Sequence, residues 1–312
     1  MSDRLKVAVI GAGHLGKHHA RLLGGLDGAQ LVAVADIDAE RARTSASPAG
    51  ARATTDYREL FDTVDAVSIA VPTELHHQVA LPFLERGKGV LVEKPMARSV
   101  AEADELIAAA AKTGSTLLVG HTERYNPAVA AVWPIVSSPR FIEVHRLGSF
   151  PDRSLDIDVV FDLMIHDLDI ILAMVRSEVA SFEAVGVPVL TSKYDIANAR
   201  LRFANGCIAN VTASRISRER VRKIRFFQPD SYISIDYAEQ EVEGWRLVRR
   251  ADAERPGIEG GRLPVVREEP LKRELLDFIG AVRDNRRPLV TGEDGRRALA
   301  LAQQIAERME SV

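Results

Sequence analysis

The sequence predicts a chain of two domains. Residues 1–122 are expected to form a doubly wound α/β domain with a parallel sheet, and residues 123–312 an α+β domain with a large, mostly antiparallel open sheet. Packing of the final helix back on the first domain is the alternative for that helix. In the first part, short apolar runs alternate with helical patterns, as in βαβ units. A glycine-rich turn follows the first of these runs. In the second part, strand-like runs follow one another without helices between them, which is typical of antiparallel sheets.

Composition limits the class of protein and its partners. The chain has 312 residues, of which 46% are hydrophobic and 27% charged, as in ordinary globular proteins of about two domains. A net charge of −3 does not favour nucleic acid or an anionic membrane as the main partner. The single cysteine, Cys207, allows no intramolecular disulfide and fits a cytoplasmic location. No signal peptide or membrane-spanning run is apparent.

The first apolar run, Lys6–Ile10, leads directly into the sequence GAGHLG and then into a helical pattern. This is the G-x-G-x-x-G fingerprint of a Rossmann domain in its required setting, after a strand and before a helix. Gly11 permits the tight turn, Gly13 lets a pyrophosphate approach the backbone, and Gly16 allows the helix to pack closely on the strand. The free N–H groups of the helix N-terminus would meet the phosphates of a dinucleotide.

The next apolar run, Leu31–Ala35, ends in Asp36, which lies 20 positions after Gly16. An acid at this spacing is expected to bind the adenosine ribose hydroxyls and to repel a 2′-phosphate. No arginine directly follows Asp36, so NAD is favoured over NADP. Asp38 is expected to cap the next helix.

The alternation continues through the rest of the first domain. The expected elements are the strand Asp65–Val71, the helix Leu75–Arg86 interrupted by Pro82, the strand Gly89–Glu93, a helix that a capping box begins at Ser99–Glu102 and that ends near Gly114, and the strand Thr116–Gly120. Ligands bind at the carboxyl ends of strands in such sheets, which makes Lys94 a candidate for chemistry. From its own stretch alone, a surface Glu-Lys-Pro turn is an equal alternative. His76 and His77 begin a helix, where a cap or surface role is common.

The second domain is expected to contain several strands, two interior helices and a final capped helix. The strands are Phe141–Arg146, Ala180–Val187, Ala197–Phe203, Cys207–Ser214, Val221–Phe227 and Tyr232–Tyr237; the helices are Val160–Val175 and Leu271–Arg283, with a capping box at Thr291–Asp294. The polar stretch Ala251–Arg262 is expected to be a loop.

Asp162 and His166 are four residues apart and would share a helix face. A carboxylate beside an imidazole raises its basicity and fixes its orientation, which suits a general base. A solvated polar face is the alternative. Pairing His166 with Asp167 or Asp169 gives no recognisable ligand set, so no metal is expected. The basic run from Arg215 to Arg225 favours a wet strand face or an oligomer contact, with phosphate binding by Arg215 or Arg218 as the functional alternative.

Five motifs in order, GAGHLG, VPTELH, VEKP, HTERYNP and DLMIHDLD, span nearly the whole chain. Together they resemble the glucose–fructose oxidoreductase, inositol dehydrogenase and rhizopine-catabolism family, written Gfo/Idh/MocA. The resemblance implies NAD(P)-dependent oxidation or reduction of a sugar or polyol carbon, and dimers or tetramers formed through the open sheet. The segments DVVFDLMIHDLDIIL, HTERYNPA and FIEVHRL most resemble the corresponding segments of one branch of the family, the UDP-N-acetylglucosamine 3-dehydrogenases of lipid A biosynthesis.

The resemblance also assigns site residues. The catalytic residues would be Lys94, Asp162 and His166. The cofactor-binding residues would be Gly11, Gly13, His14, Leu15, Gly16, Asp36, Ile37, Val71, Pro72, Thr73, His76, Glu93 and Lys94. The substrate-binding residues would be Lys94, Arg124, Tyr125, Asn126, Asp162 and His166. A nucleotide sugar also needs cations for its diphosphate, and the candidates are Arg124, Arg146, Arg153 and Arg215.

Two chemical questions stay open at this point. Either His166, held by Asp162, accepts the hydroxyl proton while Lys94 stabilises alkoxide charge, or Lys94 is itself the base. The activity is expected to be oxidation of a nucleotide sugar such as UDP-N-acetylglucosamine at C3. Oxidation of a neutral polyol, inositol or free sugar is the first alternative. A non-catalytic NAD-binding sensor or scaffold is the second, and the presence of Lys94, Asp162 and His166 argues against it.

Overall fold

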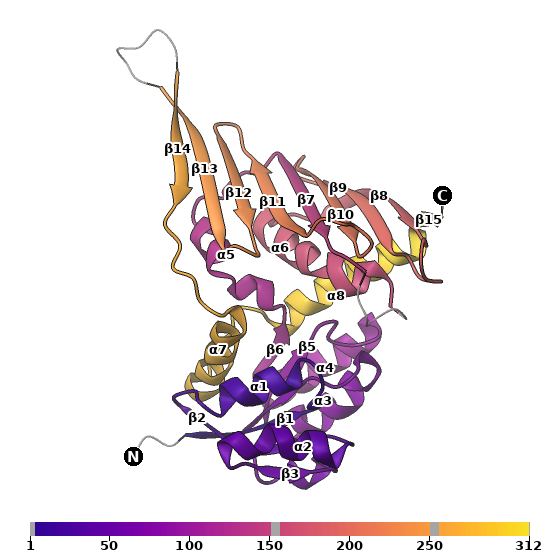
Figure 1. The fold of residues 1–312 in the computed structure, drawn as a ribbon, viewed down its shortest axis with the longest axis vertical. Helices are drawn as coiled ribbons and strands as arrows, with labels where there is room; N and C mark the ends of the chain where they lie inside the picture. The colour runs from indigo at the N-terminus through magenta and orange to yellow at the C-terminus, as the bar shows by residue number, and fades with distance from the viewer. Residues whose placement is uncertain (1–3, 151–156, 250–255, 312) are drawn as a thin grey trace. The chain divides into compact units, whose positions relative to one another are not determined.

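The computed structural model describes residues 4–150, 157–249 and 256–311. The chain forms two compact units, which Figure 1 shows as one parallel and one mostly antiparallel sheet with their helices. The first unit comprises residues up to Thr122 together with Glu269–Leu299, and the second comprises Glu123–Glu268 and the residues from Ala300 onward. The expected second domain therefore contributes residues 269–299 to the first unit.

The first unit contains a six-stranded parallel sheet in the order β3-β2-β1-β4-β5-β6, the doubly wound arrangement that the sequence predicted. The strands are β1 (Leu5–Ile10), β2 (Ala29–Ala35), β3 (Arg52–Thr54), β4 (Ala66–Ile69), β5 (Gly89–Glu93) and β6 (Leu117–Gly120). All residues of β4, β5 and β6 are buried, because helices cover both faces of such a sheet. The short edge strand β3 was not predicted.

Side chains cap some of the helices of the first unit, and others begin without such a cap. They are α1 (Gly16–Leu23), α2 (Ala39–Ala46), α3 (His76–Leu84), α4 (Val100–Thr113), α7 (Pro270–Asp284) and the first part of α8 (Gly292–Arg308), with short 3₁₀ turns η1 (Ser47–Ala49), η2 (Tyr57–Leu60), η3 (Thr73–Leu75) and η4 (Thr122–Tyr125), the last crossing into the second unit. Asp38 caps α2, and Thr291 and Asp294 bond reciprocally at the start of α8, as predicted.

The second unit is built on a nine-stranded sheet in the order β14-β13-β12-β11-β7-β10-β9-β8-β15. The strands are β7 (Phe141–Leu147), β8 (Val179–Val187), β9 (Ile196–Phe203), β10 (Ile208–Ser214), β11 (Val221–Phe227), β12 (Ser231–Asp236), β13 (Glu241–Val248), β14 (Gly257–Leu263) and β15 (Glu310–Ser311). Its pairs are antiparallel except β7 with β10 and β8 with β15, so the predicted mostly antiparallel sheet is confirmed.

Two expectations for the second unit were wrong in detail. Residues 257–262, expected to be loop, lie in β14, which pairs with β13, a strand that the sequence did not predict either. The expected helix Val160–Val175 is a π-helical turn η5 (Val160–Met164) followed by α6 (Ile165–Val175), and a further short helix, α5 (Pro127–Val132), precedes β7.

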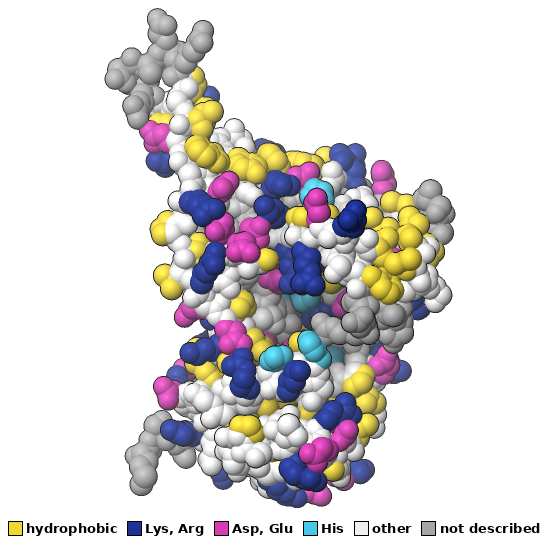
Figure 2. All heavy atoms as spheres, viewed as in Figure 1, with side chains coloured by type: hydrophobic (Ala, Val, Ile, Leu, Met, Phe, Trp, Pro, Cys, Tyr) yellow, Lys and Arg dark blue, Asp and Glu magenta, His cyan; other side chains and the backbone are white. Residues whose placement is uncertain are grey.

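Basic and acidic side chains are interspersed on the face of the molecule that Figure 2 shows. This distribution lacks the single-sign stripe that nucleic-acid binding would need on that face. None of the helices in the described ranges is both long and apolar enough to cross a bilayer.

Candidate active site

The glycine-rich turn between β1 and α1 has the geometry that a dinucleotide requires. Gly11 has a φ of +90°, and a Cβ there would lie 2.7 Å from the backbone of Ala70. A Cβ on Gly16 would lie 1.7 Å from the carbonyl oxygen of Gly11, so only glycine lets α1 pack this closely. A Cβ on Gly13 would meet nothing within 4 Å. The backbone at Gly13 is therefore open to a ligand, as the fingerprint predicts.

Asp36 lies at the carboxyl end of β2, close to the same turn. Its Oδ2 accepts a hydrogen bond of 2.7 Å from the backbone N–H of Ala12, and its Oδ1 one of 2.9 Å from Asp38. These bonds fix the carboxylate beside the turn. Arg41 also lies 3.2 Å from Asp36, although no arginine follows Asp36 in the sequence. Arg41 lies in the first turn of α2, and its guanidinium reaches back to the carboxylate of Asp36.

The other residues expected at the cofactor lie around this turn and the end of β4. Ile37 is 89% exposed and Leu15 is 40% exposed, so both offer apolar surface for a ring to cover. The rings of His14 and His18 meet edge to face, with centroids 5.9 Å apart. Val71, Pro72 and Thr73 connect β4 to α3.

Lys94 follows β5 directly, at the carboxyl edge of the parallel sheet, and the peptide bond from Lys94 to Pro95 is cis. The Lys94 side chain is half-buried, whereas Glu93 before it is only 5% exposed. The backbone N–H of Lys94 donates to Oε2 of Glu93 over 3.3 Å. Lys94 thus occupies the strand-end position where open α/β sheets bind ligands.

His76 is buried at the start of α3, and both of its ring nitrogens face backbone carbonyls. Nδ1 lies 2.8 Å from the oxygen of Pro95, and Nε2 lies 2.9 Å from the oxygen of Val71. Burial lowers the pKa of His76, although the two carbonyls act in the opposite direction. His77, in contrast, is only partly buried and contacts Glu105 over 2.8 Å.

Three residues near Lys94 were missed by the analysis of the sequence. His19, Ser68 and Glu274 are fully buried in the first unit. The helical spacing could have pointed to His19, because it places this histidine on the same buried face of α1 as Gly16, Ala20 and Leu23. A histidine at a core position of a helix needs a polar partner, and Ser68 supplies one.

In the second unit, Asp162 and His166 come from different kinds of helix. Asp162 lies in the π-turn η5, and His166 lies in the first turn of α6. Both side chains are half-buried, whereas Met164 and Leu168 of the same segment are fully buried. Asp167 and Asp169 of the same segment are buried as well, so burial does not separate its polar from its apolar residues. Single π-turns within helices occur frequently at functional sites.

The carboxylates that follow His166 are held by buried arginines. Arg146 donates to both oxygens of Asp167, with Nε 2.6 Å from Oδ2 and Nη2 3.0 Å from Oδ1. Its Nη1 donates to Glu123 over 3.1 Å. Arg124 donates to Asp169 over 3.2 Å. Burial raises the pKa of Asp167, and the Arg146 guanidinium opposes that effect.

Asn126 and Tyr125 belong to the same buried region. Asn126 caps α5 by accepting a 3.0 Å bond from the N–H of Ala128, and it donates to the carbonyl of Tyr237 over 3.0 Å. The side chain of Tyr125 is 4% exposed. These contacts hold the segment before α5 against β12 and its neighbours.

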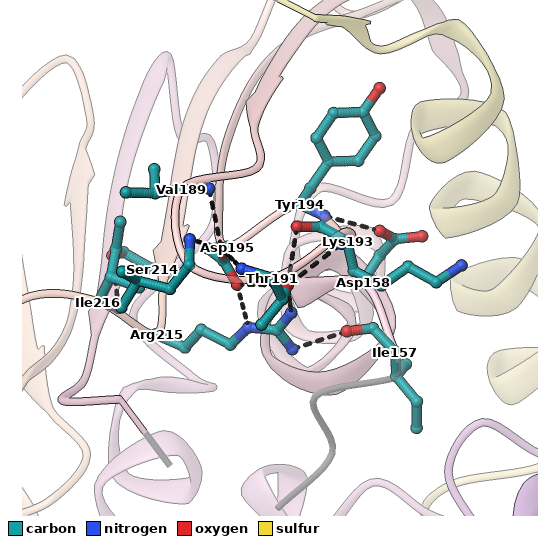
Figure 3. Close-up of polar contacts among 11 residues, drawn as sticks. Ile157, Asp158, Val189, Thr191, Lys193, Tyr194, Asp195, Ser214, Arg215 and Ile216 are labelled. Atoms are coloured by element: carbon teal, nitrogen blue, oxygen red, sulfur yellow. Dashed lines mark hydrogen bonds and ion pairs between the residues drawn. The ribbon is translucent and has the colours of Figure 1, made fainter.

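Arg215, expected to bind substrate, lies in a buried polar cluster that Figure 3 shows. Its Nε donates to Asp195 over 2.8 Å, its Nη1 to the carbonyl of Ile157 over 2.7 Å, and its Nη2 to the hydroxyl of Thr191 over 3.0 Å. Sequence pattern could not show this, because Asp195 lies in a separate segment, between β8 and β9. Arg153 lies outside the described residues.

With this geometry in view, comparison with known proteins decides the family. The family model described as "Oxidoreductase family, NAD-binding Rossmann fold" matches residues 5–121, and the model of the GFO/IDH/MocA C-terminal domain matches residues 137–228. The chain belongs to the GFO/IDH/MocA family. It is therefore an oxidoreductase, and its first unit carries the NAD-binding Rossmann domain of the family. The resemblance and the cofactor expected from the sequence are confirmed.

Relatives match from about two thirds to nearly all of the chain. UDP-N-acetylglucosamine 3-dehydrogenase of Acidithiobacillus ferrooxidans is 38% identical over 98% of both chains. A solved structure of that enzyme has a TM-score of 0.92 and 37% identity, and covers 98% of this chain and 97% of its own. Inositol 2-dehydrogenase of Rubrobacter xylanophilus is 32% identical over 69% of this chain and 66% of its own. A levoglucosan dehydrogenase complex with NADH and L-sorbose, 20% identical with a TM-score of 0.85 over 98% of this chain and 96% of its own, shows the same fold.

Proposed function

We propose that this enzyme oxidises the C3 hydroxyl of UDP-N-acetylglucosamine with NAD. The observation that carries the proposal is the match to UDP-N-acetylglucosamine 3-dehydrogenase, which extends over 98% of both chains. The identity of 38% is higher than the 32% shared with inositol 2-dehydrogenase, whose match is also shorter. Fold alone would not choose between these substrates, because one fold serves many.

The residues of the first unit fit NAD. The open backbone at Gly13 would admit the pyrophosphate, Asp36 would accept the ribose hydroxyls, and exposed Ile37 would pack on the adenine. NAD, when bound, supplies the acceptor for a hydride. The carboxylate of Asp36 disfavours a 2′-phosphate, although Arg41 beside it lessens that effect.

The chain's own residues would manage the proton. We propose that His166 accepts the hydroxyl proton and that Asp162 orients it, while Lys94 donates a hydrogen bond to the reacting oxygen and stabilises its developing negative charge. Lys94 acting as the base itself is the second possibility. Both assignments place Lys94 at the reacting oxygen.

A diphosphate needs a cation whose charge is not already balanced. The guanidinium groups of Arg124, Arg146 and Arg215 each hold a buried carboxylate. We propose Arg222 instead. It pairs with Arg146 across β7 and β11, and no carboxylate lies within ion-pair distance of it among residues 4–150, 157–249 and 256–311. Desolvation, followed by the charge of Arg146, lowers the pKa of Arg222, so a bound anion would be favourable there.

We also propose that the enzyme self-associates through the outer face of its nine-stranded sheet. Phe141, Phe227, Tyr232 and Trp245 are neighbours in register across β7, β11, β12 and β13. The ring centroids of Phe141 and Phe227 are 5.6 Å apart, and those of Phe227 and Tyr232 are 5.2 Å apart. Trp245 is 42% exposed. An aromatic row of this kind suits the core of an interface with a second copy.

A substrate screen tests the proposed function. Purified enzyme is assayed for NADH formation with NAD and, separately, UDP-N-acetylglucosamine, other UDP-sugars, free N-acetylglucosamine and myo-inositol. Turnover of UDP-N-acetylglucosamine far above the others is expected. Turnover of myo-inositol without turnover of any UDP-sugar would instead support the polyol alternative. Binding of NAD without turnover of any compound would favour a sensor.

A further inference from the structure

A chain of buried polar side chains lies directly behind Lys94 in the first unit. The hydroxyl of Ser68, in β4, lies 2.7 Å from Nδ1 of His19, in α1. Nε2 of His19 lies 3.1 Å from Oε1 of Glu93, at the end of β5. Ser68 and His19 have no exposed surface, and Glu93 is 5% exposed. Three elements that are distant in sequence therefore meet at the carboxylate of Glu93.

Glu93, which contacts His19 through one oxygen, also binds the backbone of Lys94 through the other. Its second oxygen, Oε2, accepts the hydrogen bond from the Lys94 N–H. The carboxylate is also confined sterically, because a Cβ on Gly120 of the neighbouring strand β6 would lie 3.0 Å from it. A carboxylate held by His19 on one side and by the Gly120 backbone on another has little freedom to move.

The backbone after Lys94 is held from the opposite direction. Nδ1 of His76 lies 2.8 Å from the carbonyl oxygen of Pro95, while its Nε2 lies 2.9 Å from that of Val71. His76 is 1% exposed. The imidazole thus joins the turn after β5 to the turn after β4, and Lys94 lies between two buried anchors.

The charges around Glu93 fit an anchor that stays ionised. Burial acts to raise the pKa of Glu93, but the contact with His19 and the charges of Lys94 and His76 outweigh it, and the pKa is lowered. Glu274 of α7 is the other buried acid nearby. Burial, followed by the negative charge of Glu93, raises the pKa of Glu274 well above its ordinary value. The two buried acids therefore shift in opposite directions, and the ionised form is favoured at Glu93.

We propose that Glu93, His19, Ser68 and His76 are positioning residues that hold the Lys94 backbone so that its amine meets the reacting oxygen. The proposal rests on the catalytic role of Lys94 proposed above. Burying these polar groups costs desolvation free energy that apolar side chains at the same positions would not cost. Their presence beside the Lys94 turn therefore suggests a role other than stabilising the fold. Catalysis supplies one, because misplacing a reacting group by about 1 Å can cost on the order of a hundredfold in rate.

The test is a double-mutant cycle between Glu93→Gln and Lys94→Ala, with kcat, KM, NAD affinity and Tm measured for each variant. Glu93→Gln keeps the size of the side chain but removes the charge that His19 contacts. We expect kcat to fall on the order of tenfold to a hundredfold, with NAD affinity unchanged. In the Lys94→Ala background the same substitution should have almost no further effect on kcat.

Two further variants keep the test informative if Glu93→Gln does not fold. Ser68→Ala removes the far end of the chain and should lower kcat severalfold, again only when Lys94 is present. Ser115→Ala is the matched control, because Ser115 contacts Thr113 just before β6, at the amino end of the strands, and should leave kcat unchanged.

Each outcome decides between specific explanations. Equal losses of kcat with and without Lys94 would overturn the positioning role, and so would weakened NAD binding as the main effect, because Glu93 would then act on the cofactor. If Lys94→Ala alone keeps wild-type turnover, the proposed catalytic role of Lys94 has failed, and the positioning role fails with it. That result is distinguishable because the single variant shows it.

Discussion

At the scale of single residues, Lys94 and His166 carry the proposed proton chemistry. Replacing either by alanine should lower kcat by about a hundredfold to ten-thousandfold, the usual contribution of a positioned acid or base. NAD affinity, measured by quenching of protein fluorescence, should stay close to that of the wild type. Near wild-type turnover in either variant would show that its side chain is not catalytic.

Two glycines of the same turn should respond differently to one added methyl group. A Cβ on Gly16 would overlap the carbonyl of Gly11, whereas a Cβ on Gly13 meets open space. Gly16→Ala should therefore destabilise the protein by about 1–3 kcal/mol in urea unfolding. Gly13→Ala should leave that free energy unchanged and weaken NAD binding, since the methyl group would occupy the space of the pyrophosphate. Equal stability losses in the two variants would contradict this account of the turn.

Arg222 is the cation proposed to meet the diphosphate. Arg222→Ala should raise the KM for UDP-N-acetylglucosamine about tenfold or more, because a charge-assisted contact contributes about 1.5–3 kcal/mol. The KM for a neutral sugar should not change. Arg225→Ala is the matched control on the same strand, since Arg225 points to the opposite face and pairs with Glu143 over 2.8 Å. An equal rise in KM for charged and neutral substrates would rule out phosphate recognition by Arg222.

Residue types predicted the local geometry of the glycine-rich turn, but they did not reveal the partners of the buried arginines. Gly11, Gly16 and Asp36 act through local backbone geometry, which short sequence spacing determines. The partners of Arg146 and Arg215 come from other elements, so sequence could not show that Asp167 and Asp195 already hold their charge. His19 was passed over because only the fold reveals what a buried helix face contacts.

At the scale of elements, the loop between β8 and β9 is held by one carboxylate. Oδ2 of Asp195 accepts bonds of 2.8, 2.6 and 2.9 Å from the N–H groups of Val189, Leu190 and Thr191. Burial acts to raise the pKa of Asp195, but these N–H groups and Arg215 outweigh it and lower the pKa well below its ordinary value. The ionised carboxylate therefore stabilises the fold.

The sign of this shift gives a pH dependence. Because the pKa in the folded state lies below that of the unfolded chain, the stabilisation is complete above the unfolded value of about 4 and is lost as the pH falls toward the folded value. Asp195→Asn should cost about 3–5 kcal/mol at neutral pH, since it leaves Arg215 buried without its charge partner. The difference from wild type in urea unfolding should shrink below about pH 4.

A surface pair provides the control for this prediction. Asp104 contacts Arg296 with more than a third of both side chains exposed, so Asp104→Asn should change the free energy of unfolding far less than Asp195→Asn at any pH. A difference between wild type and Asp195→Asn that stays constant into the acid range would contradict the assignment of a lowered pKa.

Two other elements were not predicted correctly from the pattern of their residues. Residues 257–262 were expected to be loop because the stretch is polar and rich in glycine, yet Gly260 and Gly261 lie within β14. A Cβ on Gly260 would lie 2.0 Å from the carbonyl of Gly244, so the pairing with β13 requires glycine there. Likewise, the spacing of Asp162 and His166 fits an α-helix and a π-turn alike.

At the scale of the whole molecule, the order of strands and helices predicted both sheets. The alternation in residues 1–122 admits few arrangements, because βαβ crossovers are right-handed. It was harder to predict from the sequence that residues 269–299 belong to the first unit. The apolar face of α7 shows that the helix covers a core, but its sequence does not say which one.

The outer face of the nine-stranded sheet predicts the assembly state. Wild-type enzyme should run as a dimer or larger in light scattering coupled to size exclusion. Trp245→Glu places a charge in the aromatic row and should shift the enzyme toward the monomer, while Trp245→Phe should not. A monomeric wild type would exclude association through this face.

The central claim is that hydride leaves C3 of UDP-N-acetylglucosamine for NAD, and isotopic labelling tests it most directly. The enzyme is given NAD and UDP-N-acetylglucosamine deuterated only at C3, and the reduced cofactor is analysed by mass spectrometry. The account predicts that the NADH formed carries the deuterium and forms more slowly than with unlabelled substrate. Unlabelled NADH, or none with this substrate under conditions where another sugar is oxidised, would contradict it.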